Sequence, residues 1–464
     1  MSMMSLQTIL HQLGHRSGAR SLREALKLGR GCITVKERAL PLKVMTYNMA
    51  LMTPGHLYVG PSSFRAQAID ELCKRVSALQ PDVVGLCEVY VDSERAQIRG
   101  RLKSLLPFFV EGPDEADLES DGGLLLLSKH PMKEVRSSIY RQTASPDNLS
   151  NKGVLFARIA PAGFPSSLDI FYTHAQAIYR GGDGQKELMS QLLHLGLMIR
   201  AHADPETPSL LMGDLNFPGE DPELYAKALG LLGQPIDLWL AQRPVPSEGA
   251  TNVRDNNFYA DPNEEGRPRA GEDHRLDYIL LHPGLRHVPQ LGSMEILKWS
   301  REGRQISDHF GVLARFSREL HADLELEGTI AGIDATITAV RCIEESDELG
   351  DDTVSFRLTV STPAGASAES AAPKRVGVAT GEGWTVTNAT AARLAGDPGA
   401  QLLLRITGKE HDGGLNGDDS LGQRTLVIPR HQLLLHQGAS LERVMPFLTG
   451  DGGEYAVTVR LTVR

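Results

Sequence analysis

Between residues 42 and 214 the chain repeats one pattern, a short and uninterrupted apolar run that ends at a polar residue. The runs are LKVMTY, DVVGL, GGLLLLS, GVLFARI, LDIFYT and SLLMG. Strands that are apolar throughout belong to sheets that are covered on both faces. The segments 64–79 and 185–199 carry apolar residues at helical spacing and supply such cover. The pattern therefore predicts an α/β fold in which helices flank two sheets.

The pattern changes after about Glu319, where alternating apolar and polar residues take over in segments such as VSFRLTV and YAVTVRLTV. Such alternation is typical of antiparallel sheets with one buried face, so we expect an antiparallel β-sandwich, with a helix only over Gly438–Leu448. A chain of 464 residues is long enough for two hydrophobic cores. We predict an N-terminal segment at 1–38, a large α/β domain at 39–319 and a β-sandwich at 320–464.

Composition narrows the class of protein. A hydrophobic content of 41% and a net charge of −10 describe a globular protein without a general attraction for nucleic acid. No window approaches the roughly 18 apolar residues that a membrane-spanning helix needs. Polar residues interrupt the apolar ones near the N-terminus, so no signal-peptide core is found. We expect a cytoplasmic or peripheral membrane protein.

Two short motifs at strand ends are suited to chemistry. Asp214 and Asn216 in GDLN are two residues apart directly after an apolar strand, so both side chains leave the same face of the backbone. Asp308 and His309 in SDHFGV directly precede another apolar strand. A histidine held by a carboxylate is the common form of a general base near neutral pH. Alone, however, GDLN is also compatible with a turn and Asp-His with a strand cap.

Four further polar residues have a functional and a structural interpretation. Asp277 lies inside RLDYILL, where a buried carboxylate needs a partner, either a catalytic imidazole or a base such as Arg275. Glu88 ends a buried strand and needs a cation, whether a metal or a Lys or Arg side chain. Asn48 is also compatible with a turn, and His174 with a structural histidine. The functional interpretation depends on the whole set.

In chain order, TYN, CE, GLLLLSKHP, THAQA, MGDLN, LDYIL and SDHFGV resemble the endonuclease/exonuclease/phosphatase superfamily from about residue 42 to 318. The resemblance implies a four-layered, DNase I-like α/β-sandwich, so that 39–319 would be a catalytic domain. It also implies that Glu88 binds Mg²⁺ with help from Asn48. His309 would be the general base, oriented by Asp277, and Asp308 would support the metal or His309.

The same resemblance implies how a phosphoryl group would be held. Asp214 and Asn216 would position the nucleophile and the phosphoryl oxygens, and His174 would contact the phosphoryl group. Water would attack phosphorus in line while Mg²⁺ offsets the charge of the leaving alkoxide.

Within the superfamily, YNMALM, CEVY, SKHP, NLSNKGVLFARI and THAQA resemble neutral and bacterial sphingomyelinases. This implies a phospholipid or sphingolipid substrate at a membrane surface, with sphingomyelin cleaved to ceramide and phosphocholine. Asp147 and Lys152 match the five-residue spacing of an Asp–Lys pair near the active site of those enzymes. Lys152 would then contact phosphate as a point charge, whereas the structural alternative is a solvated loop lysine.

The chain departs from this subfamily at its membrane-binding features. It has no counterpart of the membrane-spanning segments of the animal enzymes, and only Trp299 could serve as the aromatic that secreted bacterial enzymes insert into bilayers. Recognition of choline needs an aromatic face for its quaternary ammonium. The candidates are Tyr58, Tyr179, Phe217 and Trp239.

The C-terminal segment contains one acidic loop, HDGGLNGDDSLG, in which Asp412, Asp418 and Asp419 lie close together in sequence. The loop resembles the calcium loops of C2-type sandwiches, and carboxylates are the ligands that Ca²⁺ prefers. We therefore predict a second metal site for Ca²⁺ here. The alternative is a solvated acidic turn.

Three classes of function remain open at this point. The first is the Mg²⁺-dependent lipid phosphodiesterase. The second is a nuclease acting on DNA or RNA, which would need a groove of basic residues, and the Arg-rich segment 95–101 is the place to look for it. The third is a catalytically silent binding module that works through its C-terminal sandwich. The intact glutamate and Asp-His pair favour the first class.

Overall fold

The computed structural model describes residues 31–52, 62–114, 121–161, 167–179, 184–204, 206–243, 245–258, 273–284, 287–326, 328–344, 352–373, 375–378, 383–411, 418–438, 440–448 and 454–464. These residues fall into two compact units, one mainly Val35–Gly196 and Ala203–Ala322, the other mainly Asp323–Arg464. Most of the N-terminal segment predicted at 1–38 lies outside the described residues.

The first unit contains two six-stranded sheets. In the first sheet the order is β11 (His287–Leu297), β14 (Gly311–Leu326), β1 (Gly31–Leu51), β2 (Val83–Val89), β4 (Leu124–Ser128) and β3 (Phe108–Gly112). In the second it is β5 (Met132–Ile139), β6 (Gly153–Ile159), β7 (Leu168–His174), β8 (Ser209–Asp214), β10 (Asp277–His282) and β9 (Ile236–Asp237). Strands β1 and β2 run parallel, as do β7 and β8.

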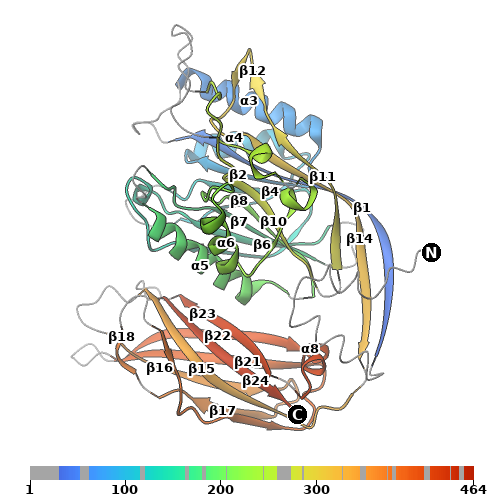
Figure 1. Ribbon diagram of the computed structural model, residues 1–464, viewed down its shortest axis with the longest axis vertical. Coiled ribbons are helices and arrows are strands. Elements are labelled where there is room, and N and C mark those ends of the chain that lie inside the picture. Colours follow the sequence, from blue (N-terminus) through green and yellow to red (C-terminus); the bar gives the residue numbers. More distant parts are fainter. Residues whose placement is uncertain are drawn as a thin grey trace. The chain divides into compact units, whose positions relative to one another are not determined.

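Helices cover the outer face of each sheet (Figure 1). Helices α3 (Ser62–Leu79) and α4 (Asp92–Leu102) lie on the first sheet, and α5 (Gln185–His202) and α6 (Pro222–Leu231) lie on the second. The inner faces of the two sheets share one core, which includes Val44, Cys87, Leu126, Leu155, Ile170 and Met212. The resulting order of helix, sheet, sheet and helix is the predicted four-layered α/β-sandwich, and it explains why the strands are apolar on both faces.

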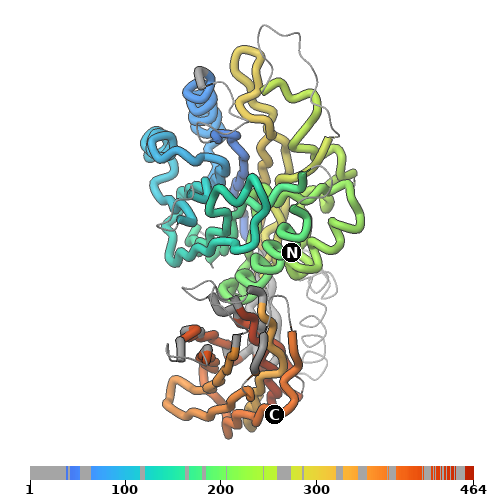
Figure 2. Tube along the Cα trace, turned by 90° about the vertical axis from the view of Figure 1, so that its left-hand side faces the viewer, coloured from blue at the N-terminus to red at the C-terminus, as the bar shows by residue number. Residues whose placement is uncertain are grey.

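The second unit is an antiparallel β-sandwich, as predicted, drawn in orange and red in Figure 2. One sheet has the order β19 (Gly383–Thr385), β15 (Gly332–Glu344), β24 (Glu454–Val463) and β23 (Ser440–Leu448), with β20 (Ala392–Ala395) also on β15. The other has the order β17 (Ser367–Ala371), β16 (Asp352–Ser361), β21 (Gln401–His411) and β22 (Asp418–Pro429), with β18 (Arg375–Val378) also on β16. Apolar residues of both sheets form a single core.

The helix expected over Gly438–Leu448 is wrong, because β23 occupies Ser440–Leu448 and pairs with β24. Cross-strand partners explain the difference. Glu442 is paired with Arg460 of β24, and their side chains form an exposed ion pair at 2.8 Å. The helix of this region is instead α8 (Arg430–Leu435).

The acidic loop lies at the start of β22. Asp412 is outside the described residues, whereas Asp418 and Asp419 are the first residues of β22, opposite His411 and Glu410 of β21. Calcium binding at this loop stays a prediction. Among the described helices, none combines the length and apolar character that crossing a membrane requires.

Candidate functional site

Three predicted residues meet because of strand register in the second sheet. His174 ends β7 and lies beside Asp214, the last residue of the parallel strand β8. Asp277 begins β10 and is the antiparallel partner of the same Asp214. The polar side chains at these strand ends therefore lie at one edge of the sheet. The apolar runs predicted this place for His174 and Asp214, whereas Asp277 was expected inside its strand.

The first sheet contributes Asn48 and Glu88 to the same place. The Nδ2 atom of Asn48 donates to Glu88 Oε1 at 2.9 Å and to Asp214 Oδ2 at 3.0 Å. The second of these bonds joins the two sheets, since Asn48 belongs to β1 and Asp214 to β8. Asn48 is fully buried, so its side chain is a structural bridge between two carboxylates and not a turn residue in solvent.

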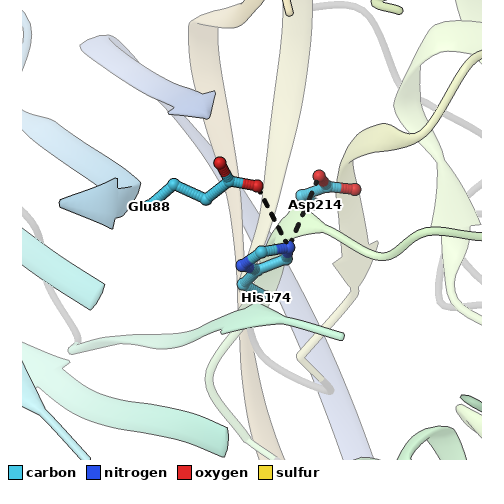
Figure 3. Close-up of side chains that lie close together, drawn as sticks. All are labelled: Glu88, His174 and Asp214. Atoms are coloured by element: carbon cyan, nitrogen blue, oxygen red, sulfur yellow. Dashed lines mark ion pairs between the residues drawn. The ribbon is translucent and has the colours of Figure 1, made fainter. Parts of the chain in front are cut away.

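Glu88, His174 and Asp214 point toward one another (Figure 3). His174 Nε2 lies 3.7 Å from Glu88 Oε1 and 3.8 Å from Asp214 Oδ2. The Nζ atom of Lys152 lies 2.9 Å from the same Nε2. An ammonium group can only donate, so this nitrogen of His174 accepts. Burial and the nearby Lys152 charge hold the pKa of His174 well below its ordinary value, which keeps the ring neutral.

Both carboxylates of this cluster resist ionisation. Burial, followed by the negative charge of Asp308, raises the pKa of Glu88 to about 7. Burial, followed by the charge of Asp277, raises the pKa of Asp214 to about 7. Two buried carboxyl groups that repel each other are stabilised by a cation that binds both. Glu88, His174 and Asp214 each offer a ligand atom within 4.8 Å of the others, and so do Asp214, Asp277 and His309.

His309 and Asp277 form the predicted pair. Nδ1 of His309 lies 2.8 Å from Asp277 Oδ2 and 3.8 Å from Asp214 Oδ2. Burial disfavours the charged ring, but the carboxylates of Asp277 and Asp214 outweigh it and raise the pKa of His309 to about 10. Asp308 is also buried, and its charge raises the pKa of both His309 and Glu88.

The structural alternative for Asp277 does not hold. Arg275 binds Asp237 instead, with Nη1 at 2.7 Å from Oδ2. The other oxygen of Asp277, Oδ1, is buried and has no hydrogen-bond partner among the described residues.

The backbone is strained at two of the predicted residues. Glu88 has a φ of 54° and Asn216 a φ of 53°, in the left-handed region that residues other than glycine rarely adopt. At Asn216 the surroundings enforce this conformation, because its Nδ2 donates to Ala175 O at 2.9 Å and its backbone N–H donates to Asp214 Oδ1. Such strain often occurs at functional sites.

Glycine is required at position 213, directly before Asp214. Gly213 has a φ of 138°, and a Cβ atom there would lie 1.9 Å from the backbone oxygen of Thr173. The missing side chain lets β7 and β8 approach closely, which places His174 beside Asp214.

Lys152 is not a solvated loop lysine, since its side chain is only 1% exposed. Its ammonium group lies 3.2 Å from Asp147 Oδ1 and donates to Ala175 O at 3.0 Å. Asp147 is held in turn by the backbone N–H of Ala177, at 2.8 Å from Oδ2. Asp147 and Lys152, five residues apart in the sequence, thus form an ion pair, and Lys152 also contacts His174.

Two of the aromatic candidates are buried, and two others, Tyr179 and Trp299, are half-buried. Trp299 stacks on Tyr47 with ring centroids 5.5 Å apart and packs against the core of the first sheet and its helices. Phe217 is fully buried against Tyr278, and Trp239 belongs to the core between the sheets. Tyr58 lies outside the described residues.

The arginines of segment 95–101 are paired with carboxylates. Arg95 binds Asp92 and Asp121, Arg99 binds Glu111, and Arg101 binds Asp70. Their charges are therefore already balanced by neighbouring side chains, which weakens the case for a basic groove at this segment.

Three site residues were not predicted from the sequence. Asn252 Nδ2 lies 3.0 Å from His309 Nε2, and Thr251 Oγ1 accepts from the backbone N–H of Asp277 at 3.2 Å. Ser307 Oγ accepts from His309 N and donates to Asn48 O. The only sequence signal for the first two was the unusual length of the loop at 243–273.

The model of the Endonuclease/Exonuclease/phosphatase family matches residues 45–309. A sphingomyelinase C of Bacillus cereus is 30% identical over 132 residues, which cover 25% of this chain and 39% of that protein. A phospholipase C of Staphylococcus aureus is 26% identical over 214 residues, or 44% of this chain and 62% of that protein. The solved sphingomyelinase C of Streptomyces griseocarneus aligns with a TM-score of 0.45 and 23% identity, covering 60% of this chain and 99% of that one.

Proposed function

Because the chain belongs to the endonuclease/exonuclease/phosphatase family, we propose that it is a Mg²⁺-dependent phosphodiester hydrolase whose substrate is sphingomyelin or a related phospholipid. The proposal rests on the residues at one edge of the α/β-sandwich. There, His309 is held by the buried carboxylate of Asp277 at 2.8 Å, and both lie beside carboxylates that are suited to bind a cation.

The donor atoms fit Mg²⁺. This ion prefers oxygen ligands and binds through one or two carboxylates, and Glu88 and Asp214 offer two that share Asn48 as a hydrogen-bond donor. Their raised pKa values are the expected property of acidic ligands without their cation. Glu88 and Asp214 would hold the ion, with Asn48 orienting both and Asp308 adding negative charge. When bound, Mg²⁺ would stabilise negative charge on the phosphoryl and leaving oxygens.

His309 would be the general base. Asp277 holds its Nδ1, so Nε2, which faces Asn252, would take the proton from the attacking water. The nearby carboxylates raise the pKa of His309, so its base form would require a bound cation that offsets the charge of Asp214. The same carboxylate stabilises the imidazolium that forms, because the two groups are buried together. Asp277 would therefore act both in orientation and in charge balance.

Three side chains would hold the phosphoryl group opposite the base. Lys152 is a buried cation, positioned by Asp147, and its three donors contact Asp147, Ala175 O and His174. It would bind a phosphoryl oxygen in the place of its contact with His174. His174 is neutral and lies at 2.9 Å from that ammonium group. Asn216 would position the nucleophile or an oxygen together with Asp214. Their arrangement supports in-line attack by water without a covalent intermediate.

A lipid substrate is supported by the two relatives named above, which are a sphingomyelinase C and a phospholipase C. Cleavage of sphingomyelin would give ceramide and phosphocholine at a membrane surface. In this proposal residues 39–319 are the catalytic domain and 320–464 an accessory sandwich, whose acidic loop would bind Ca²⁺ through Asp412, Asp418 and Asp419. Isothermal titration of Ca²⁺ into the full chain tests the loop, and the absence of a binding heat would remove that part.

The test of the whole proposal is release of phosphocholine from sphingomyelin vesicles with Mg²⁺ and with EDTA. His309→Ala is compared with His287→Ala, a buried histidine of β11 that contacts Glu319 at 3.1 Å and belongs to neither proposed metal site. Plasmid DNA is offered as a competing substrate. We expect hydrolysis that requires Mg²⁺ and His309 but not His287.

Each other result changes the proposal in a defined way. Cleavage of DNA with intact lipid would move the substrate to nucleic acid while keeping the same chemistry. Inertness toward both, with a folded protein, would favour the silent binding module.

A further inference from the structure

The Asp277–His309 pair is contacted by a dipeptide that no motif of the sequence pointed to, Thr251-Asn252. Thr251 is fully buried, and its Oγ1 accepts hydrogen bonds from the backbone N–H groups of Leu276 and Asp277, both at 3.2 Å. Its backbone oxygen accepts from Phe310 N at 2.8 Å. One residue therefore fixes the backbone at Asp277 and directly after His309.

Asn252 faces the other side of the imidazole. Its Nδ2 lies 3.0 Å from Nε2 of His309, while Asp277 holds Nδ1 at 2.8 Å. Both ring nitrogens are thus engaged, and the plane of the ring is fixed from two directions. The backbone of Asn252 is fixed as well, because it exchanges hydrogen bonds of 3.0 and 2.8 Å with His274 in an isolated antiparallel bridge.

We propose that Thr251 and Asn252 are positioning residues of the general base. This inference rests on the proposed function. Thr251 links the backbone at Asp277, in β10, to the backbone at Phe310, directly after His309 and before β14. Asn252 contacts the ring at Nε2, the nitrogen that would receive the proton, and so fixes its orientation before the reaction. Because Nε2 has one lone pair, the attacking water would take the place of the amide there, and the displaced Nδ2 would donate to the oxygen of that water. Rate in such a reaction depends on sub-ångström placement, because a shift of about 1 Å costs roughly a hundredfold.

Thr251→Val and Thr251→Ser form the decisive pair of variants. Valine keeps the shape of threonine but leaves the N–H groups of Leu276 and Asp277 without an acceptor, whereas serine keeps the hydroxyl group. We expect Thr251→Val to lower kcat on sphingomyelin vesicles by about ten- to a hundredfold with KM unchanged, and Thr251→Ser to restore the rate. Thr362→Val, at a buried threonine of the second unit, controls for the substitution itself and should leave kcat unchanged.

Asn252→Ala tests the contact with the ring. We expect kcat to fall by about tenfold, as for the loss of one hydrogen bond in the transition state, again without a change in KM. A proportional rise in KM instead would assign Asn252 to substrate binding and overturn its positioning role. Thermal unfolding of each variant shows whether the protein is folded at the assay temperature.

Nitrogen-15 spectra of the histidine rings give a readout that does not depend on activity. The resonances of His309 are identified by their absence in His309→Ala. We expect Asn252→Ala to shift Nε2 of His309 and to leave Nδ1 in place, and Thr251→Val to shift Nδ1 through Asp277. Unshifted rings together with wild-type kcat in both variants would overturn the inference. If the wild-type protein hydrolyses no phosphodiester, the proposed function fails, and the ring spectra alone decide whether the contact exists.

Discussion

Mg²⁺ affinity should depend steeply on pH, because the proposed ligands ionise near neutrality. Burial and neighbouring carboxylates raise the pKa of Glu88 and of Asp214 to about 7. Mg²⁺ binds the ionised carboxylates, so protons compete with the metal. As the pH falls through 7, the carboxylates therefore become protonated and the affinity for Mg²⁺ decreases.

The size of the effect follows from the two pKa values. A group with a pKa of about 7 is about nine-tenths ionised at pH 8 and about one-tenth ionised at pH 6. If both carboxylates must be ionised, the competent fraction falls by about a hundredfold between these pH values; if the two share one proton, it falls by about tenfold. An unperturbed carboxylate, with a pKa of about 4, would give almost no change over this range.

Isothermal titration calorimetry of Mg²⁺ at pH 6, 7 and 8 measures the affinity. Repeating it in buffers of different ionisation enthalpy counts the protons released, which should lie between about one and two at pH 6. Glu88→Gln should weaken binding at pH 8 and reduce the pH dependence to that of one carboxylate. Glu369→Gln, at an exposed carboxylate of the second unit, should change neither. An affinity that is independent of pH, or that weakens as the pH rises from 6 to 8, would refute the assignment of these ligands.

Four further outcomes are expected. Asp277→Asn should lower kcat by about 10²- to 10⁴-fold with little change in fold, because the amide keeps the shape but not the charge that stabilises His309; steady-state kinetics measures this, and an unchanged kcat would contradict it. Lys152→Met should lower kcat far more than Lys129→Met, whose side chain is 51% exposed; equal rates for the two variants would argue against phosphate contact by Lys152. Gly213→Ala should destabilise the protein by on the order of 1–3 kcal/mol, because its Cβ meets backbone; urea unfolding tests this, and wild-type stability would show that the strands can separate at no cost. The raised pKa values of Glu88, Asp214 and His309 make the folded state bind more protons, whereas the lowered pKa of His174 opposes this only up to about its ordinary pKa of 6.5. The Tm of the metal-free protein should therefore fall as the pH rises from about 7 to about 9, and a rising Tm would contradict the shifts.

Much of the candidate site was predictable because it follows from strand periodicity. A polar residue that ends an apolar strand must leave the core at the edge of the sheet, and neighbouring strand ends meet there. The apolar runs predicted that His174 and Asp214 end strands, whereas Asp277 was expected inside a strand and begins β10 instead. The register brings all three to one edge. The α/β-sandwich itself was predicted in the same way, from strands that are apolar on both faces.

The remainder depended on contacts that no local pattern encodes. Thr251 and Asn252 lie in a loop, and their partners Asp277 and His309 are 26 and 57 residues away in sequence. The partner of Asp277 was open between Arg275 and His309, because either choice satisfies a buried carboxylate. At β23 an apolar segment was read as a helix, since a short apolar run does not distinguish helix from strand and its partner strand is distant in sequence.

The site also depends on the core between the sheets. Glu88 and Asn48 come from the first sheet, whereas His174, Asp214 and Asp277 come from the second. The packing of core residues such as Cys87 and Met212 sets the distance between the site residues of the first sheet and those of the second. The hydrogen bond from Asn48 to Asp214, at 3.0 Å, joins the two sets. A substitution in this core would therefore change the distance between the carboxylates directly. The ability to hold a cation should be lost with the packing of the sheets, at substitutions that touch no polar residue of the site.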